Sequence, residues 1–223
     1  IDPADYDPLD AINWASAANV PFDECNTAYV YFAVAGESFG ELADNGVDPL
    51  PSFGWSAFEQ QQVMLALEQY ENVLGVHYEI TTDVTQATFR LITTTSDFYG
   101  AYMYPQDPAY GDAQGIAAFN VDSGGWGAFP QSLEQGGYSF ETILHEFGHG
   151  HGLAHPHDQG GGSEVMLGVT AAQFDGNRFN WIGSANDEVS VCVVWNGRTK
   201  VTKFEDLLTT PITVGGTGAA ADT

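Results

Sequence analysis

The sequence contains few basic residues, few cysteines and no long apolar run. Only 5 of its 223 residues are Lys or Arg, whereas 30 are Asp or Glu, so the formal net charge is -25. Because such a surface repels phosphate groups, nucleic acid and anionic lipid are excluded as partners. No stretch approaches the roughly 20 apolar residues that cross a bilayer, so we expect a soluble protein with no membrane partner.

The two cysteines, Cys25 and Cys192, lie near opposite ends of the chain. They fit either a disulfide formed in an oxidising compartment or two free thiols. The first residues, Ile1-Asp2-Pro3, contain no initiator Met, basic region or apolar signal core, so we interpret them as the start of a trimmed chain. The acidic charge fits salty or calcium-containing surroundings, and equally a simple need for solubility.

The content of 43% hydrophobic and 13% aromatic residues indicates a folded globular protein. Residues 1–24 have no periodic pattern, and we expect an irregular lead-in there. Its aspartates either bind calcium or form a solvated acidic tail. They are Asp2, Asp5, Asp7 and Asp10.

Strands and helices are predicted in alternation after this lead-in. Residues 27–35 are β-branched and aromatic, which is typical of a buried strand. Ser56 and Glu59 form a capping box in front of a helix that Gly75 ends. Alternating patterns predict further strands over 76–80 and 87–91. A short strand is expected over 115–122, and residues 99–111 are expected to form an aromatic loop. This order of elements predicts an α+β or mixed α/β fold.

The strongest chemical signal is the extended motif H-E-x-x-H-x-x-G-x-x-H. It is filled by His145, Glu146, His149, Gly152 and His155. Helix residues four apart lie one turn apart on the same face, so the first two histidines can hold one metal ion. Glycine adopts positive φ at no steric cost, so the chain can turn at position 152 and bring the third histidine to that ion. Three imidazoles with an open fourth position predict a catalytic zinc site, and the alternative is a histidine-rich exposed helix end.

The helix that carries the motif is expected to begin within Tyr138-Ser139-Phe140-Glu141. Ser139 is the expected N-cap, and a carboxylate at Glu141 is favourable near the positive end of the helix. His77 lies on a predicted strand and is left unassigned.

With these residues, the chain resembles the metzincin zinc metalloproteases, and most closely their serralysin-like bacterial group. The likeness covers residues 27–166 and depends on the extended motif, on Pro156 and Asp158 after it, on the lead-in at 138–140 and on the order of strands and helices. It implies a twisted, mostly parallel sheet with an antiparallel edge strand, two long helices and an irregular C-terminal part.

The resemblance also implies where a substrate lies. Residues 115–120 would match the edge strand, and an extended peptide would add to it by backbone hydrogen bonds and lie over the metal. The residues assigned to this role are Gly115, Ile116, Ala117 and Ala118.

The implied activity is that of a secreted, monomeric zinc endopeptidase whose substrates are proteins or peptides. One zinc ion held by the three histidines would polarise the scissile carbonyl and lower the pKa of its bound water to about 7. Glu146 would take the proton of that water and deliver it to the leaving amine. Asp158 would accept a hydrogen bond from a ligand histidine or cap the turn, and His157 is either an outer ligand or a solvated loop residue.

Two positions of the family pattern differ here. Metzincins have a methionine in a turn under the zinc, and the serralysin-like pattern has a tyrosine two residues later. All ten tyrosines of this chain lie at or before Tyr138, so that tyrosine is absent. Met166 is the candidate for the methionine, and Val193-Val194-Trp195-Asn196 is a competing placement in which both residues are replaced.

We divide the chain into the lead-in 1–24, a catalytic domain 25–197 and an atypical tail 198–223 that would lead towards a C-terminal repeat domain. Gly215-Gly216-Thr217-Gly218 begins a calcium-binding repeat of the kind that follows serralysin-like domains, but Ala220 stands where its Asp belongs. We therefore predict no complete repeat, and any calcium bound elsewhere would be structural.

Two other functions fit the same residues. One is a catalytically impaired zinc protein that binds peptides without cutting them, which the missing tyrosine favours. The other is a calcium-stabilised surface or adhesion module with an incidental metal site.

Overall fold

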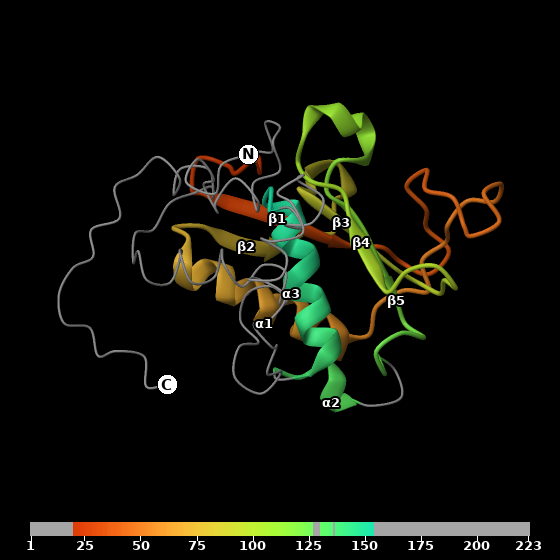
Figure 1. The fold of residues 1–223 in the computed structure, drawn as a ribbon. Coiled ribbons are helices and arrows are strands. Elements are labelled where there is room, and N and C mark those ends of the chain that lie inside the picture. The colour runs from red at the N-terminus through yellow and green to blue at the C-terminus, as the bar shows by residue number, and fades with distance from the viewer. Residues whose placement is uncertain (1–19, 127–129, 136, 154–223) are drawn as a thin grey trace, which may run out of the picture.

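The computed structural model describes residues 20–126, 130–135 and 137–153 (Figure 1). Within these residues it contains one sheet of five strands, three α-helices and two 3₁₀ helices, Val84–Gln86 and Pro108–Ala113. The strands and α-helices are, in chain order, β1 (Thr27–Phe32), α1 (Ala57–Val73), β2 (His77–Ile80), β3 (Phe89–Thr94), β4 (Ala101–Met103), β5 (Ile116–Asn120), α2 (Pro130–Leu133) and α3 (Tyr138–Gly150). This is the mixed α/β or α+β arrangement that the sequence predicts.

The sheet has the strand order β2-β1-β3-β5-β4. The first four strands in this order pair in parallel, and β4 pairs with β5 in the antiparallel direction. The expectation of a mostly parallel sheet with an antiparallel edge strand is therefore confirmed. β5 is buried along its whole length, as expected for a strand with a neighbour on each side and covered faces.

The prediction of which residues form the antiparallel edge is wrong. It places Gly115, Ile116, Ala117 and Ala118 at that edge. The last three lie in β5, which pairs in parallel with β3 and lies inside the sheet. The edge strand is β4, which lies within the segment 99–111 that the sequence predicts as loop. Because β4 has only three residues, it shows no alternation of its own, and its pairing with β5 defines it.

The predicted helix after the capping box is confirmed. The Ser56 hydroxyl accepts a hydrogen bond from the backbone N–H of Glu59, and the Glu59 carboxylate accepts one from the N–H of Ser56. The indole Nε1 of Trp126 also donates to Glu59 Oε1 at 2.7 Å. This carboxylate therefore joins the start of α1 to the loop that precedes α2 and α3.

The start of α3 differs from the prediction. Its N-cap is Gly137, which makes no side-chain cap, and not Ser139. The Ser139 hydroxyl instead lies 2.8 Å from the hydroxyl of Ser132, which also accepts the backbone N–H of Ser139 at 3.1 Å. The hydroxyl of Ser132 in α2 thus accepts a backbone N–H at the start of α3. Local sequence patterns do not predict this contact between two helices.

Different parts of the chain pack on the two faces of the sheet. Helices α1 and α3 pack on one face, and they share a core with side chains from β1, β3, β4 and β5 (Figure 1). A smaller core on the other face includes Ala33, Leu50 and Ile92, with partly buried tyrosines of β4 and its flanks against it. The helical face therefore holds the larger core, and α3 crosses it beside the edge strand.

In the part of the chain that the structure describes, no helix is both long enough and apolar enough to cross a membrane. Cys25 is exposed, and Cys192 lies outside this part. The aspartates Asp2, Asp5, Asp7 and Asp10 of the lead-in, the boundary after residue 197 and the tail 198–223 also lie outside it.

Candidate metal centre

Helix α3 carries the first half of the motif. His145, Glu146 and His149 all lie within the helix, while Phe140, Ile143 and Phe147 on its other faces are fully buried in the core. Phe147 packs edge to face on Phe89 of β3, with ring centroids 5.2 Å apart. This apolar packing orients the helix so that the histidine pair faces away from the sheet core.

The two histidines meet at their Nε2 atoms. His145 Nε2 and His149 Nε2 lie 2.9 Å apart, and their rings are nearly perpendicular, with an interplanar angle of 88°. Two imidazole nitrogens on one tetrahedral zinc ion would lie about 3.3 Å apart, because each Zn–N bond is about 2.0–2.1 Å. The pair therefore fits one metal ion, and without metal one ring can donate a proton to the other.

The tautomer of His149 follows from its other nitrogen. Nδ1 lies 2.7 Å from the carbonyl oxygen of Leu153, which can only accept, so Nδ1–H is the donor. In a neutral ring Nε2 then carries the lone pair, and it is directed towards His145. A backbone carbonyl that holds the far ring nitrogen is a common support of metal-binding histidines.

The turn that positions this carbonyl is the one predicted at Gly152. Gly152 has a φ of 91°, in the left-handed region that glycine tolerates best. Its N–H donates to the carbonyl of His149, and the N–H of Leu153 donates to the carbonyl of Gly148, both at 2.9 Å. These two bonds form a Schellman motif, which ends α3 and turns the chain back over the histidines.

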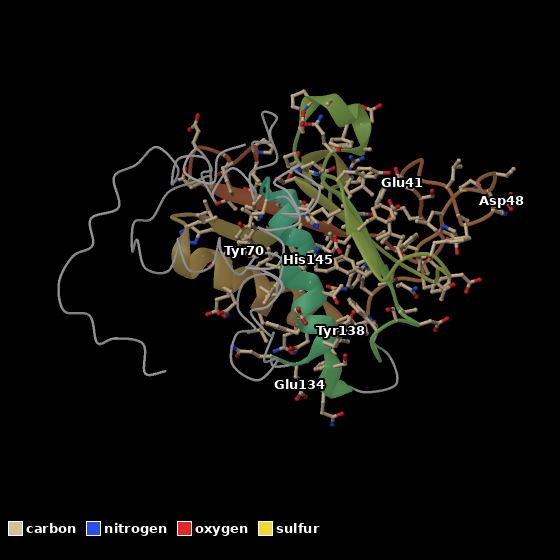
Figure 2. All side chains as sticks on the ribbon, viewed as in Figure 1. Glu41, Asp48, Tyr70, Glu134, Tyr138 and His145 are labelled. Atoms are coloured by element: carbon tan, nitrogen blue, oxygen red, sulfur yellow. The ribbon has the colours of Figure 1, made fainter. Side chains whose placement is uncertain are left out.

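Glu146 lines a cavity beside the histidine pair. The cavity has a volume of about 280 Å³ and lies between α3 and the start of the edge strand β4. Glu146 is 5% exposed, whereas Tyr138 is 62% exposed. Figure 2 labels Tyr138 and His145 on α3. The cavity is lined by Gly100, Ala101, Tyr138, Glu141, Thr142, His145 and Glu146. A carboxylate, an imidazole and an antiparallel sheet edge thus meet at one opening.

The other predicted members of the site lie outside the described residues. These are His155, His157, Asp158 and Met166. Among the residues that are described, no group of three or more metal-binding side chains occurs, since only two of the three predicted histidines fall within them. His77, to which the sequence assigns no role, is exposed on β2, and its Nδ1 lies 3.9 Å from Glu71 Oε1.

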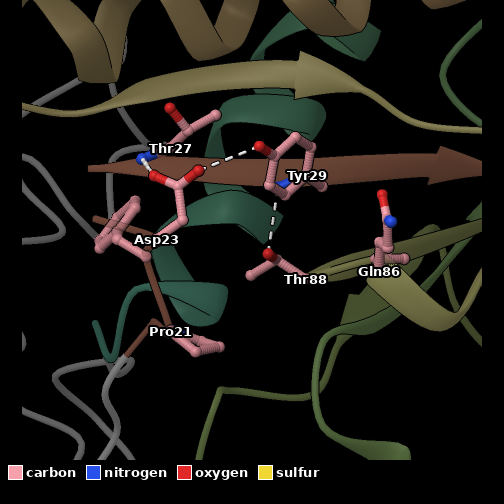
Figure 3. Close-up of a pocket in the computed structure, with 8 residues that line it drawn as sticks. Pro21, Asp23, Thr27, Tyr29, Gln86 and Thr88 are labelled. Carbon is pink, nitrogen blue, oxygen red and sulfur yellow. Dashed lines mark hydrogen bonds between the residues drawn. The ribbon is translucent and has the colours of Figure 1, made fainter. Parts of the chain in front are cut away.

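A second cavity, of about 510 Å³, opens at the amino ends of β1 and β3 (Figure 3). Asp23 and Tyr29 are hydrogen-bonded to each other there, with Tyr29 Oη 3.0 Å from Asp23 Oδ2. Ligands of open α/β sheets bind at the carboxyl ends of parallel strands, and this cavity lies at the opposite ends. It contains neither the histidine pair nor Glu146, so we do not assign the activity to it.

His151 is a residue of the motif region whose role the sequence analysis missed. It is 5% exposed and points into the core, where it stacks on the ring of Tyr70 at a centroid distance of 4.7 Å. Its Nε2 lies 2.5 Å from the hydroxyl of Tyr78, and its Nδ1 lies 2.5 Å from the carbonyl of Phe147. Burial lowers the pKa of His151 to about 4, so the ring is neutral near pH 7. Its spacing of two from His149 places it off the metal-binding face, which is the signal that separates it from the ligands.

Comparison with models of known protein families and with curated proteins gives no match to this chain.

Proposed function

We propose that this protein is a zinc-dependent endopeptidase. His145 and His149 would bind the metal together with His155, as the motif predicts. The proposal is supported above all by the Nε2 atoms of His145 and His149, which lie 2.9 Å apart, with His145 lining the same cavity as Glu146. The hydrogen bond from His149 Nδ1 to Leu153 leaves the lone pair of Nε2 on the metal side.

The residues around the cavity fit the hydrolysis of a peptide bond. A bound zinc ion would supply Lewis acidity towards the scissile carbonyl and would acidify a bound water. Glu146 would accept the proton of the attacking water and transfer it to the leaving amine. Its location one residue after His145, in a largely buried position, suits a base that acts beside the metal without binding it.

The edge strand supports a peptide as the substrate. Among the strands that the structure describes, β4 pairs only with β5, and the cavity reaches its first residue, Ala101, and the preceding Gly100. An extended peptide would pair with the free side of β4 by backbone hydrogen bonds, which recognise main chain of any sequence. This role replaces the one that the sequence analysis assigned to residues 115–118.

The test measures cleavage and metal binding separately. Casein and quenched fluorescent peptides are incubated with the wild-type protein, with and without a zinc chelator, and bound zinc is counted by mass spectrometry. Glu146→Gln should retain zinc and lose about 10²-fold to 10⁴-fold in rate. His145→Ala and His149→Ala should lose zinc as well as activity. Glu134→Gln and His77→Ala change exposed residues outside the site and serve as matched controls.

The missing tyrosine favours one alternative, a zinc protein that binds peptides without cutting them. All ten tyrosines lie at or before Tyr138, so the pattern of the serralysin-like group is incomplete after the motif. The same assay separates the two functions. Bound zinc with no chelator-sensitive cleavage of any peptide would support the binding protein and contradict the endopeptidase.

A further inference from the structure

A buried polar network lies behind the histidine pair, between α1, β2 and α3. Tyr70 is fully buried, and Tyr78 and His151 are 6% and 5% exposed. Removing such polar groups from water is costly unless each finds a hydrogen-bond partner. Each of the three has one, and two of the acceptors are backbone carbonyls of α3 itself.

The directions of the bonds follow from the acceptors. The carbonyl of Phe147 can only accept, so His151 donates from Nδ1, and in the neutral ring Nε2 must then accept. The donor to Nε2 is the hydroxyl of Tyr78. The carbonyl of Phe147 therefore fixes the tautomer of His151, and the hydroxyl of Tyr78 on β2 holds the orientation of its ring.

Tyr70 forms a hydrogen bond with α3 about one turn before Phe147. Its hydroxyl donates to the carbonyl of Leu144 at 2.5 Å, and its ring lies flat on His151, with an angle of 7° between the planes. Leu144 directly precedes His145. The two carbonyls that receive these bonds, those of Leu144 and Phe147, lie within the same stretch of α3 as the histidine pair.

Apolar packing alone does not define the rotation of a helix well. It is non-directional, and a helix face can turn by several degrees with little change in buried area. The bond from Tyr70 of α1 to the carbonyl of Leu144, and the bond from Tyr78 of β2 to His151 at the end of α3, tie two points of the helix to different elements. Together they define both the rotation and the axial position of α3. A Phe at position 70 and a Leu at 151 would fill similar space with no polar group to satisfy, so bulk stability alone does not explain these residues.

We propose that Tyr70, together with His151 and Tyr78, positions the metal-binding face of α3. This role depends on the proposed metal site. It makes Tyr70 and His151 positioning residues that touch neither metal nor substrate, and it assigns a function to the histidine of the motif region that is not a ligand.

The experiment compares metal binding by two tyrosine variants. Tyr70→Phe removes the hydroxyl that binds Leu144, and Tyr102→Phe removes a hydroxyl that donates to Glu41 on the other face of the sheet. Each variant is first shown to be folded by circular dichroism. Zinc affinity is then measured by competition with a chromogenic chelator, and Co²⁺ is bound to the metal-free protein so that its visible absorption reports the ligand geometry.

The expected result is a zinc affinity about 10-fold to 100-fold weaker in Tyr70→Phe, with a changed Co²⁺ spectrum, and no comparable change in Tyr102→Phe. Tyr78→Phe, which acts only through His151, should change the spectrum in the same way and replaces Tyr70→Phe if that variant does not fold. A normal affinity and spectrum in the folded Tyr70→Phe or Tyr78→Phe variant would overturn the positioning role alone. A wild-type protein that binds neither metal would overturn the proposed site, and the positioning role with it.

Discussion

Gly150 of α3 lies against Met103 of β4 with no space for a side chain between them. A Cβ placed on Gly150 would overlap the sulfur of Met103 and would lie 2.9 Å from Cε1 of Phe89. The glycine thus lets the last turn of the histidine-bearing helix approach the antiparallel edge strand closely. This contact fixes the distance between the helix and the strand that border the cavity.

Gly150→Ala should therefore destabilise the protein, although alanine is the better helix former. Overpacking of a buried contact costs about 1–3 kcal/mol, which exceeds the gain in helix propensity of about 1 kcal/mol. Urea denaturation followed by circular dichroism measures the change. In a double-mutant cycle, Met103→Ala should recover part of the loss, since the methionine sulfur is the nearer of the two obstacles. Equal costs in the presence and absence of Met103 would contradict this account.

The two residues of the capping box should differ in their effect on stability. Ser56→Ala removes only a helix cap and should cost about 1 kcal/mol. Glu59→Ala removes the reciprocal cap bond and also leaves the indole N–H of Trp126, which is 3% exposed, without its acceptor. Loss of a partner by a buried donor costs about 1–3 kcal/mol more. The free energies of unfolding of the two variants test this order, and an equal or larger loss in Ser56→Ala would contradict it.

His151 should make the metal-free protein less stable in mild acid. Burial lowers its pKa to about 4 in the folded state, whereas the unfolded chain has the ordinary value of 6.5. Above pH 6.5 both states are neutral and the stability is complete. As the pH falls from 6.5 to about 4, only the unfolded state binds the proton, so folding loses on the order of 3 kcal/mol.

The measurement compares wild-type and His151→Leu proteins between pH 4 and 8. Both contain the other histidines and the same carboxylates, so the difference between their free energies of unfolding isolates position 151. The wild type should lose more stability than the variant over this window. Parallel curves would mean that His151 is protonated in the folded state.

The net charge should select among peptide substrates through long-range attraction. At -25 the protein attracts cations and repels anions from a distance. For a lysine-containing peptide, we expect kcat/KM to fall about tenfold as salt is raised from about 0.01 M to about 0.5 M, because the screening length then shrinks from about 30 Å to a few Å. A neutral peptide of the same length is the control and should respond little. The same salt response for cationic, neutral and anionic peptides would contradict steering.

Local features of the chain were predictable from the sequence. Ser56 and Glu59 are three residues apart, and the bonds that they exchange involve no other part of the protein. The spacing of His145 and His149 places two imidazoles on one helix face whatever surrounds the helix, and a glycine at position 152 is suited to the left-handed turn that follows.

Features that depend on distant partners were not predictable in this way. β4 is a strand only because β5 offers it a ladder, and its three residues carry no periodic signal. Ser139 does not cap α3, because a hydroxyl from α2 bonds to it instead. The orientation of His151 depends on Tyr78, which lies 73 residues earlier in the chain.

The sequence by itself determined that two histidines and a carboxylate share one stretch of helix and that the chain turns just after it. Those results follow from helix geometry and from the conformational freedom of glycine, which act over a few residues. Only the tertiary structure decided which strand forms the open edge beside them, and which buried groups hold the helix in its place. Strand order and hydrogen bonds between distant segments arise when the sheet and its helices pack together, and no short run of residues encodes them.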